Sequence, residues 1–445
     1  MPLFCPYCFD DRGLRKRLEE IRPHFDEGNC SIHPRRKGLP MDAIAAVADE
    51  VFRANFDYGG VDYYDDPDDP GAHGPQRGDY LSDAIYGLTQ TVDDSVLNAL
   101  VEQLIEDDFY LPQDGEEPFY LDEDDVKYER VDAGEGGHGR AWHSFCHTVT
   151  HEQRFLNPKA ADLLADIFKY IHLQRDVSKR CPIYRIDPKD GLHFHRARIV
   201  TDAIRAEIQD DPARHLGPPP RRLGKPNRMN PSGIPALYAS FDIATCISEL
   251  RPLVGAEIIS AEFELIRDIV VLDTTRFAAP VKELNLFAKD HIRRISQWRF
   301  MQRFMSEIAK PISPDDEHLD YVPTQFVAEY LNKLHEVRIG KDRQHIDAII
   351  YRSAQRPEGK NIVLLGDAAQ VKGVSMQKTP TFPSWALSLG EPDALNNPGV
   401  SYVTRSLKAM VVSAADFPVT QQMLYERPSN PKLQPSLRDP LEDAF

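Results

Sequence analysis

The sequence predicts an α+β protein in which a small Cys/His unit and a mainly helical region precede a domain of mixed strands and helices. Three observations support this fold class. Three of the six cysteines lie within the first 30 residues, apolar residues recur at helical spacing between residues 41 and 178, and strand-like runs begin only after about residue 180. We therefore expect four segments: residues 1–38, residues 39–178, residues 179–375 and a C-terminal extension over residues 376–445.

The first segment combines two pairs of metal-binding side chains. Cys5 and Cys8 form one pair with two residues between them, and Cys30 and His33 repeat that spacing 22 residues later. Zinc in structural sites takes four thiolate or imidazole ligands in a tetrahedron, and a tight turn with this spacing supplies two of them. We expect a structural Zn²⁺ held by these four residues, with a helix over residues 12–22 between the pairs.

The segment that follows is expected to be helical. Amphipathic runs cover residues 41–56, 95–106, 141–155 and 158–174. Pro158 suits the first turn of the last run, because proline lacks the backbone N–H that a helix start leaves unused. These runs predict a helical N-terminal domain between the metal unit and the strands.

The acidity of the chain is concentrated in this helical segment. The net charge is −17, but residues 57–135 hold 24 acidic and three basic residues, so they alone carry −21 and the remainder carries +4. A protein that coats nucleic acid needs a basic face, so the composition argues against nucleic acid as the partner. We expect a solvating or regulatory surface there.

The sequence shows neither a membrane span nor an export signal. No stretch of about 18 apolar residues is present, and the N-terminus lacks an apolar leader core. A large secreted protein would show paired cysteines along its whole length, whereas here they cluster. We expect a cytoplasmic protein that keeps its cysteines reduced and meets no membrane.

After residue 180 short strands and helices follow one another. Strand-like runs cover residues 182–186, 236–240, 257–265, 268–273, 348–353 and 361–366, and helical runs cover residues 242–250, 286–309 and 324–337. The strands do not alternate with helices in a strict βαβ order. We therefore expect mixed sheets with flanking helices rather than a doubly wound parallel sheet.

A basic loop precedes the second of these strands and suits an anionic ligand. Four cations stand within eight residues: Arg221, Arg222, Lys225 and Arg228. An Asn-Pro-Ser-Gly turn at residues 230–233 then leads into a strand with Tyr238 and a helix with Glu249. Arginine offers paired donors to phosphate oxygens, so a diphosphate is the favoured ligand.

This order of residues resembles the RES-domain family, known mainly as the toxins of bacterial RES–Xre toxin–antitoxin modules. In that family an arginine, an Asn-Pro-x-Gly-x-Pro turn, a tyrosine and a glutamate follow one another, and a serine lies on a later strand. The matching residues here are Arg228, Asn230, Gly233, Tyr238, Glu249 and Ser353. An upstream arginine is offered by Arg196 or Arg198. The resemblance spans roughly residues 180–370.

The N-terminal half resembles the arrangement of longer members of the family, which carry a Cys knuckle and a HEPN-like helical region. His33 departs from that pattern, since a cysteine is common at the last ligand position. The resemblance implies an ADP-ribosyltransferase-like fold and NAD⁺ as the substrate. It also implies, as partner, an Xre-type antitoxin or another inhibitor protein, and we add a homo-oligomer as a further expectation.

The resemblance implies cleavage of the bond between nicotinamide and ribose by hydrolysis or phosphorolysis, or transfer of ADP-ribose to a protein. Arg228 and Arg196 would contact the diphosphate, with Arg198 as the other candidate. Tyr238 would stack on nicotinamide or ribose, and Glu249 would face the developing positive charge or orient the acceptor. Ser353 would bond the nicotinamide amide or a neighbouring arginine. Asn230 and Gly233 are the remaining residues expected to bind NAD⁺.

Two other functions compete with this hypothesis. Arg140 and His147 meet the loose spacing of HEPN ribonucleases, in which His147 would act as acid and base. The acidic segment beside them would repel RNA, which argues against that function. The other alternative is an inactive RES-like domain whose acidic region docks a basic partner. The presence of all four motif residues (Arg228, Tyr238, Glu249 and Ser353) argues against it.

Overall fold

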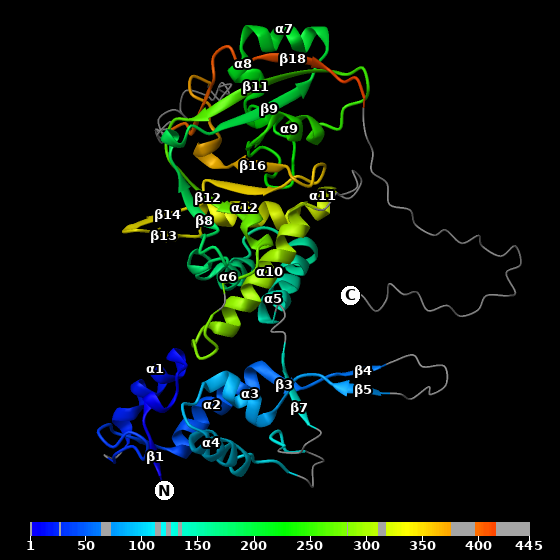
Figure 1. Cartoon of the computed structure of the whole chain (residues 1–445). Coiled ribbons are helices and arrows are strands. Elements are labelled where there is room, and N and C mark those ends of the chain that lie inside the picture. The colour runs from blue at the N-terminus through cyan, green and yellow to red at the C-terminus, as the bar shows by residue number, and fades with distance from the viewer. Residues whose placement is uncertain are drawn as a thin grey trace, which may run out of the picture.

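The structure is a computed structural model that describes residues 2–25, 28–63, 73–111, 117–121, 126–131, 136–282, 284–309, 317–374 and 397–414. Its elements form three groups along the long axis of the molecule (Figure 1). An N-terminal lobe stands at one end, a layer of long helices follows, and a large mixed sheet lies at the other end. The expected α+β fold class is confirmed.

The N-terminal lobe is built on amphipathic helices. They are α1 (Arg12–Ile21), α2 (Met41–Asn55), α3 (Leu81–Thr89) and α4 (Asp94–Glu106). Asp11 and Asp93 cap α1 and α4 by accepting hydrogen bonds from backbone N–H groups of the first turn. Strands β1 (Leu3–Phe4) and β2 (Leu39–Pro40) pair across the metal unit. The helices expected at residues 12–22, 41–56 and 95–106 are confirmed.

The lobe also holds strands that the helical pattern did not predict. β3 (Phe56–Tyr58), β7 (Lys127–Arg130) and β6 (Asp79–Tyr80) form a small antiparallel sheet, and β4 (Val61–Tyr63) pairs with β5 (His73–Gln76). The prediction of a mainly helical region over residues 39–178 is therefore incomplete. Each strand has only two to four residues, which is too few to show an alternating apolar pattern.

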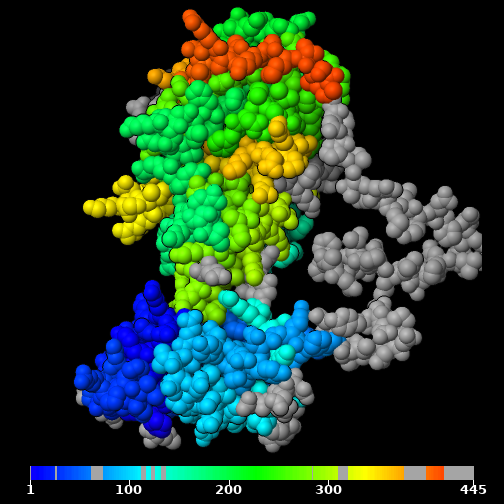
Figure 2. Space-filling model, in the orientation of Figure 1, coloured from blue at the N-terminus to red at the C-terminus, as the bar shows by residue number. Residues whose placement is uncertain are grey.

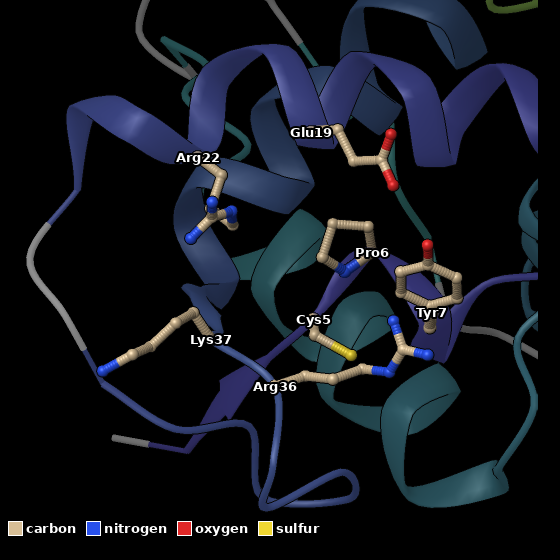
Figure 3. A pocket seen from close by; sticks show the side chains of 7 residues that line it. All are labelled: Cys5, Pro6, Tyr7, Glu19, Arg22, Arg36 and Lys37. Carbon is tan, nitrogen blue, oxygen red and sulfur yellow. The ribbon is translucent and has the colours of Figure 1, made fainter.

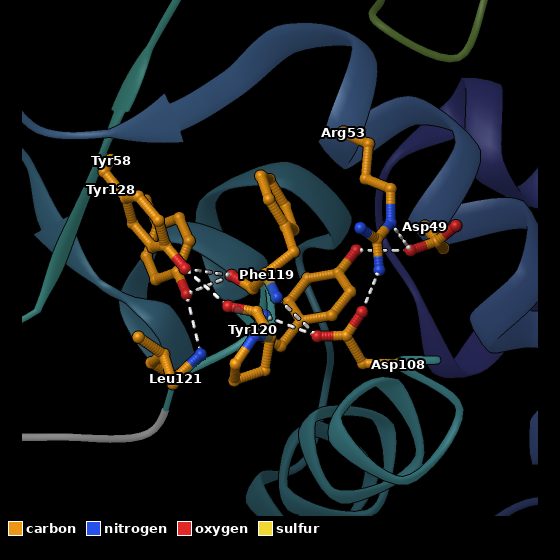
Figure 4. A network of polar contacts seen from close by, with 9 residues as sticks. Asp49, Arg53, Tyr58, Asp108, Phe119, Tyr120, Leu121 and Tyr128 are labelled. Carbon is orange, nitrogen blue, oxygen red and sulfur yellow. Dashed lines mark hydrogen bonds and ion pairs between the residues drawn. The ribbon is translucent and has the colours of Figure 1, made fainter. Parts of the chain in front are cut away.

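An ion pair between the exposed Arg53 and the buried Asp108 organises the aromatic core beside these strands (Figure 4). Arg53 donates to Asp108, and the other oxygen of that carboxylate accepts from the backbone N–H groups of Phe119 at 2.6 Å and Tyr120 at 2.9 Å. Asp49 accepts from Arg53 and, at 2.8 Å, from the Tyr120 hydroxyl. The Asp108 carboxylate is buried, so its charge depends on these partners. Part of the acidity of the N-terminal lobe is therefore structural.

Long helices form the middle layer. They are α5 (Gly136–His147), α6 (Pro158–Phe168), α10 (His291–Ala309) and α12 (Val322–Lys333). α5 continues as a π-helical turn over Thr148–Glu152, and α6 stops before Tyr170, which adopts a left-handed φ of 60°. The run predicted over residues 141–155 therefore starts and ends earlier than its sequence pattern indicated, and the run predicted over residues 158–174 is shorter. No helix within the described ranges is long and apolar enough to cross a membrane.

The large sheet has nine strands among the described residues, in the order β17-β11-β9-β10-β16-β15-β12-β8, with β18 also paired to β11. The strands expected from the sequence are β8 (Ile183–Ile186), β10 (Leu237–Ser240), β11 (Glu257–Leu265), β12 (Ile269–Asp273), β15 (Ala348–Arg352) and β16 (Lys360–Leu364). The others are β9 (His193–Ile199), β17 (Val400–Tyr402) and β18 (Lys408–Val411). Among the nine described strands only β12 and β15 pair in parallel, so the sheet is mixed.

Each face of the sheet packs against a different apolar layer. Val363 and Ile349 face the core of the helical layer, which includes Trp298 and Phe304. The alternate residues face a second core, which is covered by α7 (Asp202–Asp210) and α8 (Pro212–Leu216). Smaller elements complete the fold: α9 (Ile243–Glu249), α11 (Glu317–Asp320) and the hairpin of β13 (Val337–Ile339) and β14 (Asp342–Gln344). The sheet is therefore buried on both sides.

The sheet continues past residue 375, where the sequence analysis placed the end of this segment. β17 and β18 belong to the expected C-terminal extension, yet both pair with β11. We therefore propose that the domain built on the large sheet reaches at least residue 411. The prediction separated these strands because they are short and follow a long polar stretch without an apolar pattern.

The segment before α10 joins the N-terminal lobe to the rest of the molecule. Phe287 is 2% exposed and lies in the core of that lobe. Beside it, the Asn285 side chain donates to Asp11, and Lys289 forms an ion pair with Glu20 at 3.2 Å. The two polar contacts are exposed and contribute little, so the buried ring carries most of the contact energy.

We predict that Phe287→Ala weakens this junction. Removing a buried phenylalanine side chain costs about 3–5 kcal/mol, because both the burial and the packing are lost. The variant should unfold at a lower temperature in calorimetry and be cut faster by protease near residue 287. Phe155→Ala is the matched control, because Phe155 is 81% exposed. Equal unfolding curves for the two variants would contradict the prediction.

Candidate functional site

Polar side chains line up on one face of the large sheet. β10, β16 and β15 are neighbours, and their registers place Ser240 opposite Asn361 and Asn361 opposite Tyr351. Residues that stand directly opposite in antiparallel strands share a face of the sheet. The adjacent row on that face contains Tyr238 and Val363, which pack against the helical layer. The apolar face therefore ends in a polar row.

Glu249 is held against this row from the end of α9. The Ser353 hydroxyl donates to Glu249 Oε1 at 2.6 Å, and the Asn361 amide donates to the same oxygen at 2.7 Å. Oε2 of Glu249 has no hydrogen-bond partner among the residues that the structure describes, and the residue is exposed. One carboxylate oxygen is therefore fixed by the protein, and the other is not held by any described residue.

The turn after β15 fixes the Ser353 hydroxyl. Its oxygen accepts from the backbone N–H groups of Gln355 and Arg356 at 3.1 Å each, so its hydrogen is directed to Glu249. Gly359 closes this turn against α9. A Cβ atom at residue 359 would lie 2.5 Å from Thr245 Oγ1, so only glycine allows the turn to approach the helix this closely.

Arg228 lies at the C-terminus of α10. Its Nη1 donates to the backbone carbonyl oxygens of Ile308 and, at 3.3 Å, Glu307. Carbonyl groups at a helix C-terminus carry partial negative charge, which favours a cation there. The guanidinium also lies over the Tyr321 ring, 5.7 Å from its centroid, and the Thr324 hydroxyl donates to the Arg228 carbonyl. The basic loop is thus anchored to both α10 and α12.

Asn230 and Gly233 shape the loop that carries Arg228. The Tyr238 hydroxyl donates to Asn230 Oδ1 at 2.8 Å and accepts from the Met229 backbone N–H at 3.0 Å. Asn230 is buried, and its amide donates to the Ile234 carbonyl at 2.9 Å. Gly233 has a φ of 84°, a conformation that favours glycine. The Asn230 amide and the Tyr238 hydroxyl therefore both form hydrogen bonds with atoms of this loop.

Tyr351 stands opposite Asn361 in the polar row. Burial raises its pKa, the charge of Glu249 raises it further, and the charge of Arg228 opposes the change. Burial and Tyr351 likewise raise the pKa of Tyr238 well above its usual value. Sequence reasoning did not assign Tyr351 or Asn361 to the site. The sequence signal for them was the alternation of side chains between the two faces of β15 and β16. This alternation places Tyr351 on the same face as Ser353.

The two upstream arginines occupy different environments. Arg196 on β9 donates to the backbone carbonyl of Tyr238, and its Nε is buried without a hydrogen-bond partner in the described part of the chain. Burial lowers the pKa of this guanidinium. Arg198 is exposed and donates to the His215 carbonyl at 2.9 Å. The structure therefore brings Arg196, and not Arg198, next to the cluster.

Cys5, Cys8, Cys30 and His33 converge as predicted. Their ligand atoms all lie within 4.8 Å of one another. The separations include 4.0 Å from Cys5 Sγ to Cys8 Sγ, 3.5 Å from Cys8 Sγ to Cys30 Sγ and 3.4 Å from Cys5 Sγ to His33 Nδ1. A tetrahedral zinc ion with Zn–S distances of about 2.3 Å has edges of about 3.8 Å. The four residues therefore fit Zn²⁺.

Burial and neighbouring N–H groups act on the three thiols in opposite directions. Burial raises the pKa of Cys5 and Cys8. Burial acts in the same direction on Cys30, but backbone N–H groups of His33 and Cys5 donate to its sulfur and lower its pKa to about 7. Three buried thiolates at this spacing repel one another unless a cation lies between them. These residues would hold zinc in a structural role.

A hollow of about 440 Å³ lies beside the metal cluster (Figure 3). It is lined by Cys5, Pro6, Tyr7, Glu19, Arg22, Arg36 and Lys37. The Arg36 and Arg15 guanidinium groups cover the Tyr7 ring, at 3.4 Å and 4.7 Å from its centroid. No lining residue belongs to the Glu249 cluster. The hollow is therefore a feature of the metal unit and not of the candidate catalytic groups.

Arg140 and His147 both lie on α5 and are both exposed. The imidazole of His147 lies 3.3 Å from the Glu152 carboxylate and 5.5 Å, between ring centroids, from His151. The structure thus places these residues in solvent on a helix of the middle layer. The ribonuclease function of Arg140 and His147 stays a prediction.

Residues 194–386 match the family model described as the RES domain. The chain carries a RES domain. RES domains are a family of NAD⁺-utilising toxin domains, and the match includes Arg228, Tyr238, Glu249, Ser353 and Asn361. The metal unit and the N-terminal lobe lie outside the match. Neither a curated protein nor a solved structure matched the chain.

We predict that the isolated protein holds one zinc ion and that Cys30→Ser loses most of it. Serine removes one soft ligand and the sulfur that accepts two backbone hydrogen bonds. Atomic emission on dialysed protein measures the metal content. Cys181→Ser is the control, because Cys181 lies outside the metal unit, and it should keep the ion. A zinc content that is the same in all three proteins would refute the assignment.

We also predict that Gly359→Ala displaces the turn that carries Ser353. The added methyl group must push against Thr245, at a cost of about 1–3 kcal/mol. Thermal unfolding should show a lower midpoint. Gly87→Ala on α3 meets no atom within 4 Å and should be neutral or slightly stabilising. A midpoint for Gly359→Ala equal to that of the unsubstituted protein would show that the turn does not press on α9.

Proposed function

We propose that the RES domain of this chain cleaves the bond between nicotinamide and ribose in NAD⁺. The observation that carries the proposal is the exposed Glu249, whose Oε2 is not bound by any described residue. Its partner oxygen is fixed by Ser353 and Asn361, so the carboxylate is oriented before any ligand binds. The match to an NAD⁺-utilising family supports the substrate.

The chemistry needs an oriented negative charge more than an acid. Nicotinamide leaves as a neutral group, so the transition state gains positive charge on the ribose. A carboxylate held close to that charge stabilises it more strongly than water does, since its position is set in advance. Glu249 supplies this carboxylate in our proposal. Ser353 holds Glu249, a role that replaces the contact with the nicotinamide amide expected from the sequence.

The positive side of the site receives the diphosphate in our proposal. Arg221, Arg222 and Lys225 are exposed on the loop, and Arg228 lies at its inner end. Arginine forks match phosphate oxygens well. Arg196 supports the backbone of β10 beside Tyr238, so we assign it to the shape of the site. Tyr238 and Tyr351 are the rings that we propose to border nicotinamide and ribose.

Three acceptors of ADP-ribose remain compatible with this site. Water gives ADP-ribose, phosphate gives a phosphorylated ADP-ribose, and a protein side chain gives a modified protein. An enzyme that depletes NAD⁺ is toxic to the cell. An Xre-type antitoxin or another inhibitor protein would then act by covering the exposed Glu249. A homo-oligomer and a cytoplasmic location belong to the same proposal.

We predict that Glu249→Gln lowers the rate of nicotinamide release from NAD⁺ on the order of a hundredfold, because the amide keeps the shape and removes the charge. Release is followed by chromatography with purified protein, with and without phosphate. Glu264→Gln, an exposed glutamate of β11, is the matched control and should be active. Equal rates for the two variants would refute the role of Glu249.

The same preparations separate the alternatives. RNA cleavage that survives Glu249→Gln and is lost in His147→Ala would establish the ribonuclease function instead. A protein that neither cleaves NAD⁺ nor is stabilised by it in thermal unfolding would be an interaction protein. Our proposal predicts that NAD⁺ raises the unfolding midpoint of Glu249→Gln, in which binding is preserved and cleavage is slow.

A further inference from the structure

Asn361 makes a contact with Glu249 that no motif assigns. It is the central strand residue of the polar row, between β10 and β15, and is 3% exposed. Its Nδ2 donates to Glu249 Oε1 at 2.7 Å. A buried amide group must satisfy its donors and its acceptor, so this contact depends on what its oxygen does.

Ser240 determines which way the Asn361 amide points. The Ser240 hydroxyl donates to Asn361 Oδ1 at 2.6 Å, and the two residues stand directly opposite each other on β10 and β16. A hydroxyl that donates to the amide oxygen leaves the NH₂ group on the other side, where Glu249 lies. The amide orientation is therefore set by the sheet register and does not depend on a ligand.

We propose that Asn361, anchored by Ser240, is a positioning residue that fixes Oε1 of Glu249 and so keeps Oε2 turned toward the substrate. Ser353 alone would leave the carboxylate free to rotate about a single hydrogen bond. A second donor on the same oxygen, from a different strand, removes that freedom. The inference rests on the proposed function for the identity of the substrate. The contact between Asn361 and Glu249 is independent of that function.

The test first adds a second negative charge to the pair and then reverses which residue carries the charge. Asn361→Asp keeps the size and the bond from Ser240, but it puts a second carboxylate against Glu249. We expect the unfolding midpoint to fall by roughly 2–4 °C or more, and kcat for NAD⁺ to fall on the order of a hundredfold with KM changed less than about threefold. The double variant Asn361→Asp/Glu249→Gln restores an amide–carboxylate pair with the roles reversed. It should recover at least about half of the lost stability and none of the activity.

Asn332→Asp is the matched control. Asn332 is also a partly buried asparagine, but it donates to the Ile346 backbone carbonyl away from the cluster. Its change should leave kcat within about twofold, and Glu249→Gln should not rescue its midpoint.

The outcomes separate the two proposals. Absence of NAD⁺ cleavage by the unsubstituted protein refutes the proposed function, while the midpoints still report on the contact. An active protein in which Asn361→Asp keeps kcat within about twofold refutes the positioning role. A double variant that is no more stable than Asn361→Asp refutes the pairing of Asn361 with Glu249.

Discussion

The candidate site depends on how one carboxylate is held. Glu249 ends a short helix, and donors from the turn after β15 and from β16 meet on its Oε1. This contact requires that α9 packs against β15 and β16 in one register, that the turn after β15 closes on Gly359, and that the polar row begins where the apolar core ends. A carboxylate without these donors would rotate freely in solvent and could not be oriented before binding.

α10 relates the remaining parts of the molecule to that carboxylate. The segment before it buries Phe287 in the N-terminal lobe, and its last carbonyl groups hold Arg228 beside the sheet. One helix therefore joins the lobe next to the metal unit to the positive side of the site. The acidic segment contributes to the same lobe through the buried Asp108, so its charge has a structural part as well as an exposed one.

Much of the fold could be predicted because it depends on local periodicity. The amphipathic runs became α2 and α4, the apolar runs became the central strands, and the two Cys/His pairs converged. The residues Arg228, Tyr238, Glu249 and Ser353 were found in order along the chain. Asn361 was missed because its partners are 112 and 121 residues away and appear only when the sheet register is known. Arg196 could not be oriented for the same reason, since it bonds a backbone carbonyl of another strand.

In our proposal NAD⁺ binds on the polar row with its reacting bond beside Glu249. A crystal structure of the Glu249→Gln variant with NAD⁺ tests this most directly, because the variant retains the site and slows cleavage. We expect density for nicotinamide and its ribose next to residue 249 and Tyr351, with the diphosphate toward Arg228 and the basic loop. Ordered NAD⁺ at another place, for example in the hollow beside the metal unit, would contradict it.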